Sequence, residues 1–130
     1  EGFAPLAAAY SLPSSTDEEK AEKEKIMASA LKEACQVPLA IMEKGAEILD
    51  IVEILSVKGS VMAVSDAGVA AQFTRTAVLG ASMNVYINTK TMKDRTLAEE
   101  YNEKADRLNA YTSEKADEIF KKIEEALKCR

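Results

Sequence analysis

The chain contains no histidine, and its only two cysteines, Cys35 and Cys129, lie far apart in the sequence. Without histidine or a close pair of thiolates, the usual zinc ligand sets cannot form, and histidine-based acid–base catalysis is excluded. We therefore predict no metal site. Isolated cysteines outside a CxxC motif are typical of reduced thiols, so the sequence predicts a cytoplasmic protein.

Long apolar runs and basic clusters are also missing. No apolar segment approaches the ~20 residues that span a membrane. The 17 basic residues are outnumbered by 22 acidic ones, giving a net charge of −5. The Lys and Arg residues form no basic cluster separate from the acidic residues. Because phosphate backbones are bound by clustered cations, we predict neither a nucleic-acid partner nor a membrane partner. The chain starts at Glu1 without an initiator Met or a basic leader, so we expect it to begin within a longer protein.

Glycine, proline and aromatic residues are scarce: five Gly, three Pro, 5% aromatic residues and no Trp. With so few turn signals, the secondary-structure elements should be few and long. The apolar residues are mainly Ala, Leu, Ile, Val and Met, which together with Glu and Lys favour helix. A chain of 130 residues fits one domain. We predict an all-α fold, an antiparallel bundle of long helices, over residues 1–130.

Capping residues and apolar spacing predict the helices of the first half. Residues 1–10 are expected to be helical and to end before Pro13. Thr16 and Glu19 have the spacing of a capping box. An apolar stripe follows at steps of three and four: Met27, Ala30, Leu31, Ala34, Val37, Ile41, Ile48, Val52 and Leu55. Because the stripe continues across Pro38, we predict one helix from Thr16 to Lys58, kinked near Pro38, with Gly59 as a left-handed cap.

The second half predicts two further helices. One begins at Ser65 or Asp66, runs to Met92, and is unusually small-sided and apolar. We expect it to be the most buried element, packed through Ala71, Ala77 and Ala81, and to contribute to a dimer contact. The last helix begins at an Asp94 cap and runs to Lys128. Charged residues on its wet side are spaced for i,i+4 pairs, such as Glu100 with Lys104 and Asp117 with Lys121.

Four polar residues of the third predicted helix are candidates for a functional role. Arg75 is either half of a structural ion pair or an anion contact. Asn84 and Asn88 are spaced i,i+4 and therefore share a face, either as an interhelical hydrogen-bond pair or as the polar lining of a cleft. Asp66 is either a first-turn acid or a functional carboxylate. The spacing leaves these alternatives open.

Several segments in combination resemble the folate cyclodeaminase/cyclohydrolase family. The segments are Ala9 to Pro13, Cys35-Gln36-Val37-Pro38-Leu39, Ser65 to Ala71, Gly80 to Asn88 and Met92-Lys93-Asp94. That family includes the cyclodeaminase half of formiminotransferase-cyclodeaminase and a bacterial methenyltetrahydrofolate cyclohydrolase. The resemblance spans nearly the whole chain with matching spacing between the segments.

The resemblance implies an enzyme that works as a homodimer in one-carbon folate metabolism. Its reaction would be cyclodeamination of 5-formiminotetrahydrofolate or hydrolysis of 5,10-methenyltetrahydrofolate, and the sequence does not separate the two. The folate is the substrate, and no further cofactor is implied. Asp66 is expected to face the cationic carbon centre, Asn84 and Asn88 the pterin or amide edges, and Arg75 the anionic glutamate tail.

One departure from the family pattern concerns the start of the chain. The family carries a Gly-rich segment and an acidic residue just before the equivalent of Gly2 and Phe3. We therefore expect the catalytic acid to lie upstream of Glu1, and residues 1–130 to be the C-terminal part of a longer domain with little activity alone. The alternative is a non-catalytic scaffold domain, in which the asparagine pair sets helix register.

Overall fold

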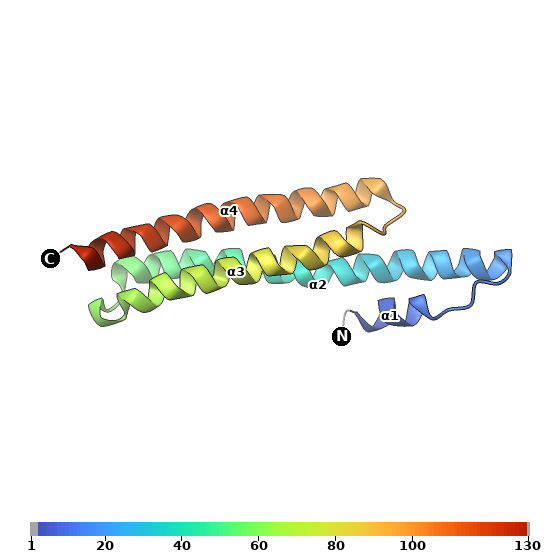
Figure 1. The fold of residues 1–130 in the computed structure, drawn as a ribbon, viewed down its shortest axis with the longest axis horizontal. Helices are drawn as coiled ribbons and strands as arrows, with labels where there is room; N and C mark the ends of the chain where they lie inside the picture. Colours follow the sequence, from blue (N-terminus) through green and yellow to red (C-terminus); the bar gives the residue numbers. More distant parts are fainter. Residues whose placement is uncertain (1–2, 130) are drawn as a thin grey trace.

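A computed structural model describes residues 3–129 as an elongated helical bundle (Figure 1). The elements in order are α1 (Ala4–Tyr10), α2 (Asp17–Lys58), the 3-10 turn η1 (Val61–Ala63), α3 (Val64–Thr89) and α4 (Arg95–Lys128). The helices α2, α3 and α4 lie side by side, with α3 antiparallel to the other two, and α1 packs on the N-terminal part of α2. Residues 3–129 contain no strand, which confirms the all-α prediction. None of these helices is both long and apolar enough to cross a membrane.

The predicted start and continuity of α2 are confirmed. The Thr16 Oγ1 accepts a hydrogen bond from the Glu19 amide at 3.1 Å, and the Glu19 carboxylate accepts one from the Thr16 amide at 3.0 Å. This reciprocal capping box satisfies two amides that have no partner within the helix. The helix then continues through Pro38 without interruption. The bend near Pro38 stays a prediction.

The boundaries of the α2–α3 turn differ from the prediction. Gly59 does end α2, but with φ −73° and ψ 177°, so a left-handed cap is wrong. Glycine is needed there because a Cβ would lie 2.4 Å from the Leu55 carbonyl oxygen. The predicted start of the next helix at Ser65 or Asp66, with Ser65 as a good N-cap, is also off, because α3 begins at Val64. The side chain of Ser60 opens the 3-10 turn by accepting from the Met62 amide, and α3 follows without a side-chain cap.

The end of α3 and the start of α4 agree better with the prediction. The helix α3 stops at Thr89, three residues before the predicted Met92. The Asp94 side chain accepts from the Leu97 amide at 3.1 Å and caps α4, as predicted. Ion pairs spaced i,i+4 do form along α4, between Lys128 and Glu124 and between Arg107 and Glu103. The residues named in the prediction pair with neighbouring helices instead. Lys104 bonds Glu43 of α2, and Asp117 bonds Arg75 of α3.

The core of α2 is offset from the predicted apolar stripe. Leu31 and Val52 are buried as expected, but the residues that fill the middle of the bundle are Met42 and Leu49. Four stripe residues lie about half exposed: Val37, Ile41, Ile48 and Leu55. The prediction was wrong there because α2 carries two adjacent apolar faces, and helical spacing alone does not tell which one the chain itself covers.

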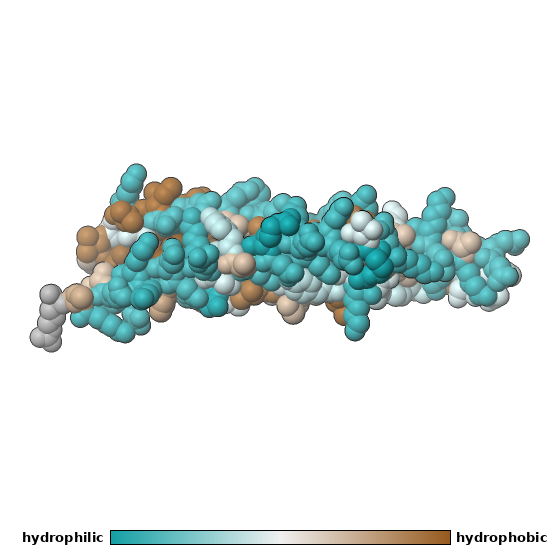
Figure 2. Space-filling model, turned by 90° about the horizontal axis from the view of Figure 1, so that it is seen from above, coloured by the Kyte–Doolittle hydropathy of each residue, from teal (hydrophilic) through white to brown (hydrophobic). Residues whose placement is uncertain are grey.

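One face of α3 is likewise open. Ala71 and Ala81 are buried, as predicted, whereas Ala77 is exposed. The helix packs against both α2 and α4, so it is central in the bundle, but its remaining side faces solvent. By contrast, the surface seen from the α4 side is largely hydrophilic, with hydrophobic residues gathered at the end where α2 meets α3 (Figure 2).

Candidate substrate-binding cleft

A cleft of about 280 Å³ opens where the start of α1, the middle of α2 and the second half of α3 meet. Its walls are apolar except for two amide side chains. The lining residues are Phe3, Ala34, Val37, Pro38, Ile41, Ala81, Asn84 and Asn88. The cleft therefore joins three segments that are far apart in the sequence.

Pro38 explains why Asn88 points into this region. In a regular helix the amide of residue 38 would donate to the carbonyl of Ala34, but proline has no N–H. The Asn88 Nδ2 donates to that free Ala34 oxygen at 3.3 Å. The proline thus creates an acceptor on α2, and the asparagine on α3 satisfies it across the helix interface. This contact fixes the amide of Asn88 at the wall of the cleft.

Asn84 lies one turn earlier on the same face of α3. Its Nδ2 contacts the carbonyl oxygen of Gly80 at 3.4 Å, a weak contact within its own helix. The sequence prediction that Asn84 and Asn88 share a face is confirmed. Amide groups on an apolar wall suit a flat heterocycle that carries donors and acceptors along its edge.

The described lining contains no titratable side chain. These residues can bind and orient a ligand, but a proton donor or acceptor must come from elsewhere in the protein. Cys35 is nearby in sequence but does not supply one. It is fully buried, and burial raises the pKa of its thiol to about 11, so it packs as a neutral side chain.

Asp66 and Arg75 lie outside this cleft. Asp66 lines a separate groove of about 310 Å³ beside Leu55 and Ala70, at the other end of α3. Asp66 and Asn84 are 18 positions apart, so the rise along the helix between them is about 27 Å. Arg75 faces α4 and bonds Asp117 at 3.2 Å, the structural alternative for that residue. Of the four predicted site residues, the structure therefore brings together only Asn84 and Asn88 within one chain.

A second pocket of about 280 Å³ lies between the α1–α2 linker and the α3–α4 turn. Its floor contains Met27 and Leu31, and three lysines surround it. All three lysines already have partners, and Lys20 bonds Asp17 at 3.1 Å. Lys23 donates to the carbonyls of Tyr10 and Leu12 at 2.9 and 2.7 Å, and Lys93 bonds Glu24. Local sequence signals do not predict that these segments meet, because the pocket depends on how the linker folds back.

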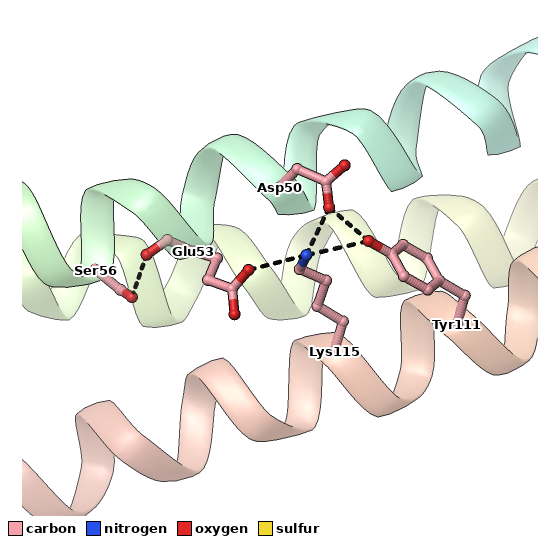
Figure 3. Close-up of polar contacts among 5 residues, drawn as sticks. All are labelled: Asp50, Glu53, Ser56, Tyr111 and Lys115. Carbon is pink, nitrogen blue, oxygen red and sulfur yellow. Dashed lines mark hydrogen bonds and ion pairs between the residues drawn. The ribbon is translucent and has the colours of Figure 1, made fainter.

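A polar cluster on the α2–α4 side was also missed (Figure 3). The Lys115 Nζ bonds Asp50 at 2.6 Å, Glu53 at 2.9 Å and the Tyr111 hydroxyl at 3.1 Å. Tyr111 in turn donates to Asp50. These hydrogen bonds raise the pKa of Lys115 and lower the pKa of Asp50. Each group has a partner inside the cluster, so we interpret it as a clamp between the two helices.

Comparison with known proteins gives a family and several relatives. Residues 1–107 match the family described as Formiminotransferase-cyclodeaminase. A methenyltetrahydrofolate cyclohydrolase from Methylorubrum extorquens is 43% identical over 100 residues, which are 77% of this chain and 48% of that protein. A formimidoyltransferase-cyclodeaminase from Rattus norvegicus is 34% identical over 97 residues, 75% of this chain and 18% of the relative. The chain thus spans half or less of the length of these relatives.

Proposed function

Because the chain belongs to the formiminotransferase-cyclodeaminase family, we propose that it is part of an enzyme of one-carbon folate metabolism. The substrate would be 5,10-methenyltetrahydrofolate or 5-formiminotetrahydrofolate. The observation that carries this proposal is the cleft itself. Two of the segments that resemble the family, Cys35 to Leu39 and Gly80 to Asn88, meet there together with Phe3, although up to 85 residues separate these parts of the chain.

In this proposal the cleft binds the flat bicyclic ring system of the folate. The amides of Asn84 and Asn88 contact its polar edge, and the apolar walls exclude water from its faces. Both reactions pass through a carbon centre with positive charge and need proton transfer. The described lining has no titratable group, so the acid or base is supplied by another part of the protein.

Of the two reactions we favour hydrolysis, because the cyclohydrolase relative has the higher identity, 43% against 34%. Water would add to the methenyl carbon, and the ring would open to the formyl derivative. We further propose that the enzyme is a homodimer. A cytoplasmic setting agrees with the two free cysteines, Cys35 and Cys129.

The test is to express the intact gene product and follow loss of the methenyl chromophore, with ammonia release from the formimino compound measured in parallel. Asn84→Ala should lower kcat/KM about tenfold or more, the effect of losing one good hydrogen bond to substrate, with an unchanged Tm. Asn88→Ala should do the same and also cost about 1 kcal/mol of stability, because the Ala34 carbonyl loses its partner.

Gln36→Ala is the matched control, since this exposed amide is on α2 beside the cleft but not in its lining. It should leave turnover unchanged. Normal turnover in both asparagine variants would refute the cleft as the binding site. An intact protein that neither binds nor converts any folate would leave the scaffold alternative.

A further inference from the structure

The short helix α1 carries part of the cleft wall, but little apolar area holds it in place. It has seven residues, Ala4–Tyr10, and Phe3 at its N-cap lines the cleft. Helices shorter than about 12 residues are marginal by themselves, so the position of α1 depends on its packing against α2. Leu6 and Ala9 are the buried residues of this helix. They lie three residues apart on one side of α1, and the alanine buries little area.

Lys23 of α2 adds a polar contact at the C-terminal end of α1. Its Nζ donates to the carbonyl oxygen of Tyr10 at 2.9 Å and to that of Leu12 at 2.7 Å. The lysine is half-buried, so water competes less for these two bonds than it would on an open surface. A cation at this end of a helix also complements the negative end of the helix dipole. One side chain thus joins α2 to the last residue of α1 and to the linker after it.

Pro13 explains why the carbonyl of Tyr10 is free to accept from Lys23. The last turn of α1 closes with bonds between residues three apart, because the amides of residues 11 and 12 donate to the carbonyls of residues 8 and 9. The next donor in this series would be residue 13, which is a proline and has no N–H. The Lys23 ammonium group donates in its place.

Both sides of the cleft are therefore fixed by a side chain that replaces a donor missing at a proline. On the α3 side, Asn88 donates across the helix interface to the carbonyl that Pro38 leaves free. On the α1 side, Lys23 acts at Tyr10, seven residues and about 10 Å along the helix from Phe3. Because so short a helix moves as a rigid unit, holding its C-terminal end also fixes the position of Phe3.

We propose that Lys23 is a positioning residue of the cleft. Its two hydrogen bonds hold α1 against α2 and thereby keep Phe3 in the cleft wall. Lys23 is not part of the cleft lining, so it acts through α1 and not by contact with a ligand. The effect on ligand binding rests on the proposed function, whereas the tether between α1 and α2 does not.

The tether is tested without ligand by amide hydrogen exchange in the intact protein. Lys23→Met keeps the length of the side chain but has no donor, so the amides of residues 7–10 should exchange about tenfold faster or more. Lys20→Met is the matched control, since Lys20 is an exposed lysine three residues earlier that bonds Asp17. Lys23→Arg should restore protection, because a guanidinium group donates to two oxygens at once. Equal protection of α1 in Lys23→Met and Lys20→Met would overturn the proposal.

The effect on the cleft is tested by titrating the same variants with 5-formyltetrahydrofolate, a stable reduced folate, and measuring Kd by calorimetry. Lys23→Met should weaken binding about threefold or more, because only molecules with α1 docked present the complete cleft. Phe3→Ala should weaken binding too, and adding Lys23→Met to it should change Kd little further, because the lysine acts through that wall.

Two outcomes of this titration would overturn the positioning role in a protein that binds the folate. They are an unchanged Kd in Lys23→Met and losses of Lys23→Met and Phe3→Ala that simply add. A wild-type protein that binds no folate would instead refute the proposed function, and with it the effect on ligand binding. Hydrogen exchange would still decide the tether.

Discussion

The two sides of α3 differ in how far the rest of the chain covers them and pairs their polar groups. Toward α4, several polar groups are matched across the interface: Tyr86 donates to Asp106, and Thr89 donates to Asn102 at 2.6 Å. Toward solvent, beside α2, the same helix shows apolar side chains and Gly80, whose Cβ position has no atom of residues 3–129 within 4 Å. The chain itself covers the α4 side, whereas residues 3–129 leave apolar surface uncovered on the α2–α3 side. Function is therefore to be sought on the α2–α3 side.

The α2–α4 side shows how a completed interface looks in this molecule. Lys115 of α4 is 18% exposed and bonds two carboxylates of α2 (Figure 3). The residues that follow on α4, including Ile119 and Ile123, are buried against Leu49 and Val52. This part of α4 lies beyond residue 107, where the family match ends. We infer that it serves stability, in contrast to the cleft, whose lining lies entirely within the match.

The largest effect is expected from two neighbouring residues on α2. Leu49→Ala should destabilise the chain by about 2–5 kcal/mol, because Leu49 is fully buried in the core between α3 and α4. Ile48→Ala should cost less than about 1 kcal/mol, because Ile48 is 47% exposed on the open face. Urea unfolding at a concentration where the protein is monomeric measures both. Equal losses would contradict the division between core and open face.

A smaller effect is expected at the clamp. Lys115→Met should cost about 1–2 kcal/mol, because Asp50, Glu53 and Tyr111 lose their shared partner but remain accessible to water. Lys121→Met is the control, since Lys121 is an exposed lysine of the same helix. Thermal unfolding at neutral pH distinguishes them. A Tm for Lys115→Met equal to that of the control would show that the clamp contributes nothing.

The smallest effect is the pH dependence of the same clamp. The hydrogen bond from Lys115 holds the pKa of Asp50 below its usual range, so the stabilisation is complete above about pH 4 and is lost as pH falls through the folded value. The pKa of Lys115 is raised, so its stabilising contribution is complete below about pH 10.4 and is lost as pH rises through its folded pKa. Tm measured from pH 2 to 11 should therefore fall less steeply at both ends in Lys115→Met. Identical profiles would exclude the cluster as a source of pH dependence.

Much of the fold could be predicted from local signals. The capping residues Thr16 and Asp94 act within four residues of themselves, so the starts of α2 and α4 are readable from the sequence. The left-handed conformation predicted for Gly59 was wrong because a glycine at a helix end can also be extended, as it is here. The close approach of the Leu55 carbonyl, which favours glycine at this position, is not visible in the sequence. The cross-helix pairs of Lys104 and Asp117 also depend on neighbours that the sequence does not place.

The site was half predictable for the same reason. Asn84 and Asn88 share a face by helical spacing, and the structure confirms this. The acceptor that holds Asn88 is the Ala34 carbonyl. It is free of a helical hydrogen bond because the residue four positions later is Pro38. Because proline has no N–H, the sequence could have predicted that another group donates to this carbonyl. Asp66 lies too far along α3 to join the pair within one chain, and spacing on a single helix already implied this distance.

The most direct test of the central claim is to locate a bound folate on the protein. The side-chain amide signals of Asn84 and Asn88 can be followed by NMR while a stable reduced folate is titrated into the intact, isotopically labelled protein. We predict that both signals shift together and saturate, while the side-chain amide signal of Gln36 stays in place. Shifts confined to Met27, Thr91 and Lys93, around the lysine-lined pocket, would contradict the assignment of the cleft to the substrate.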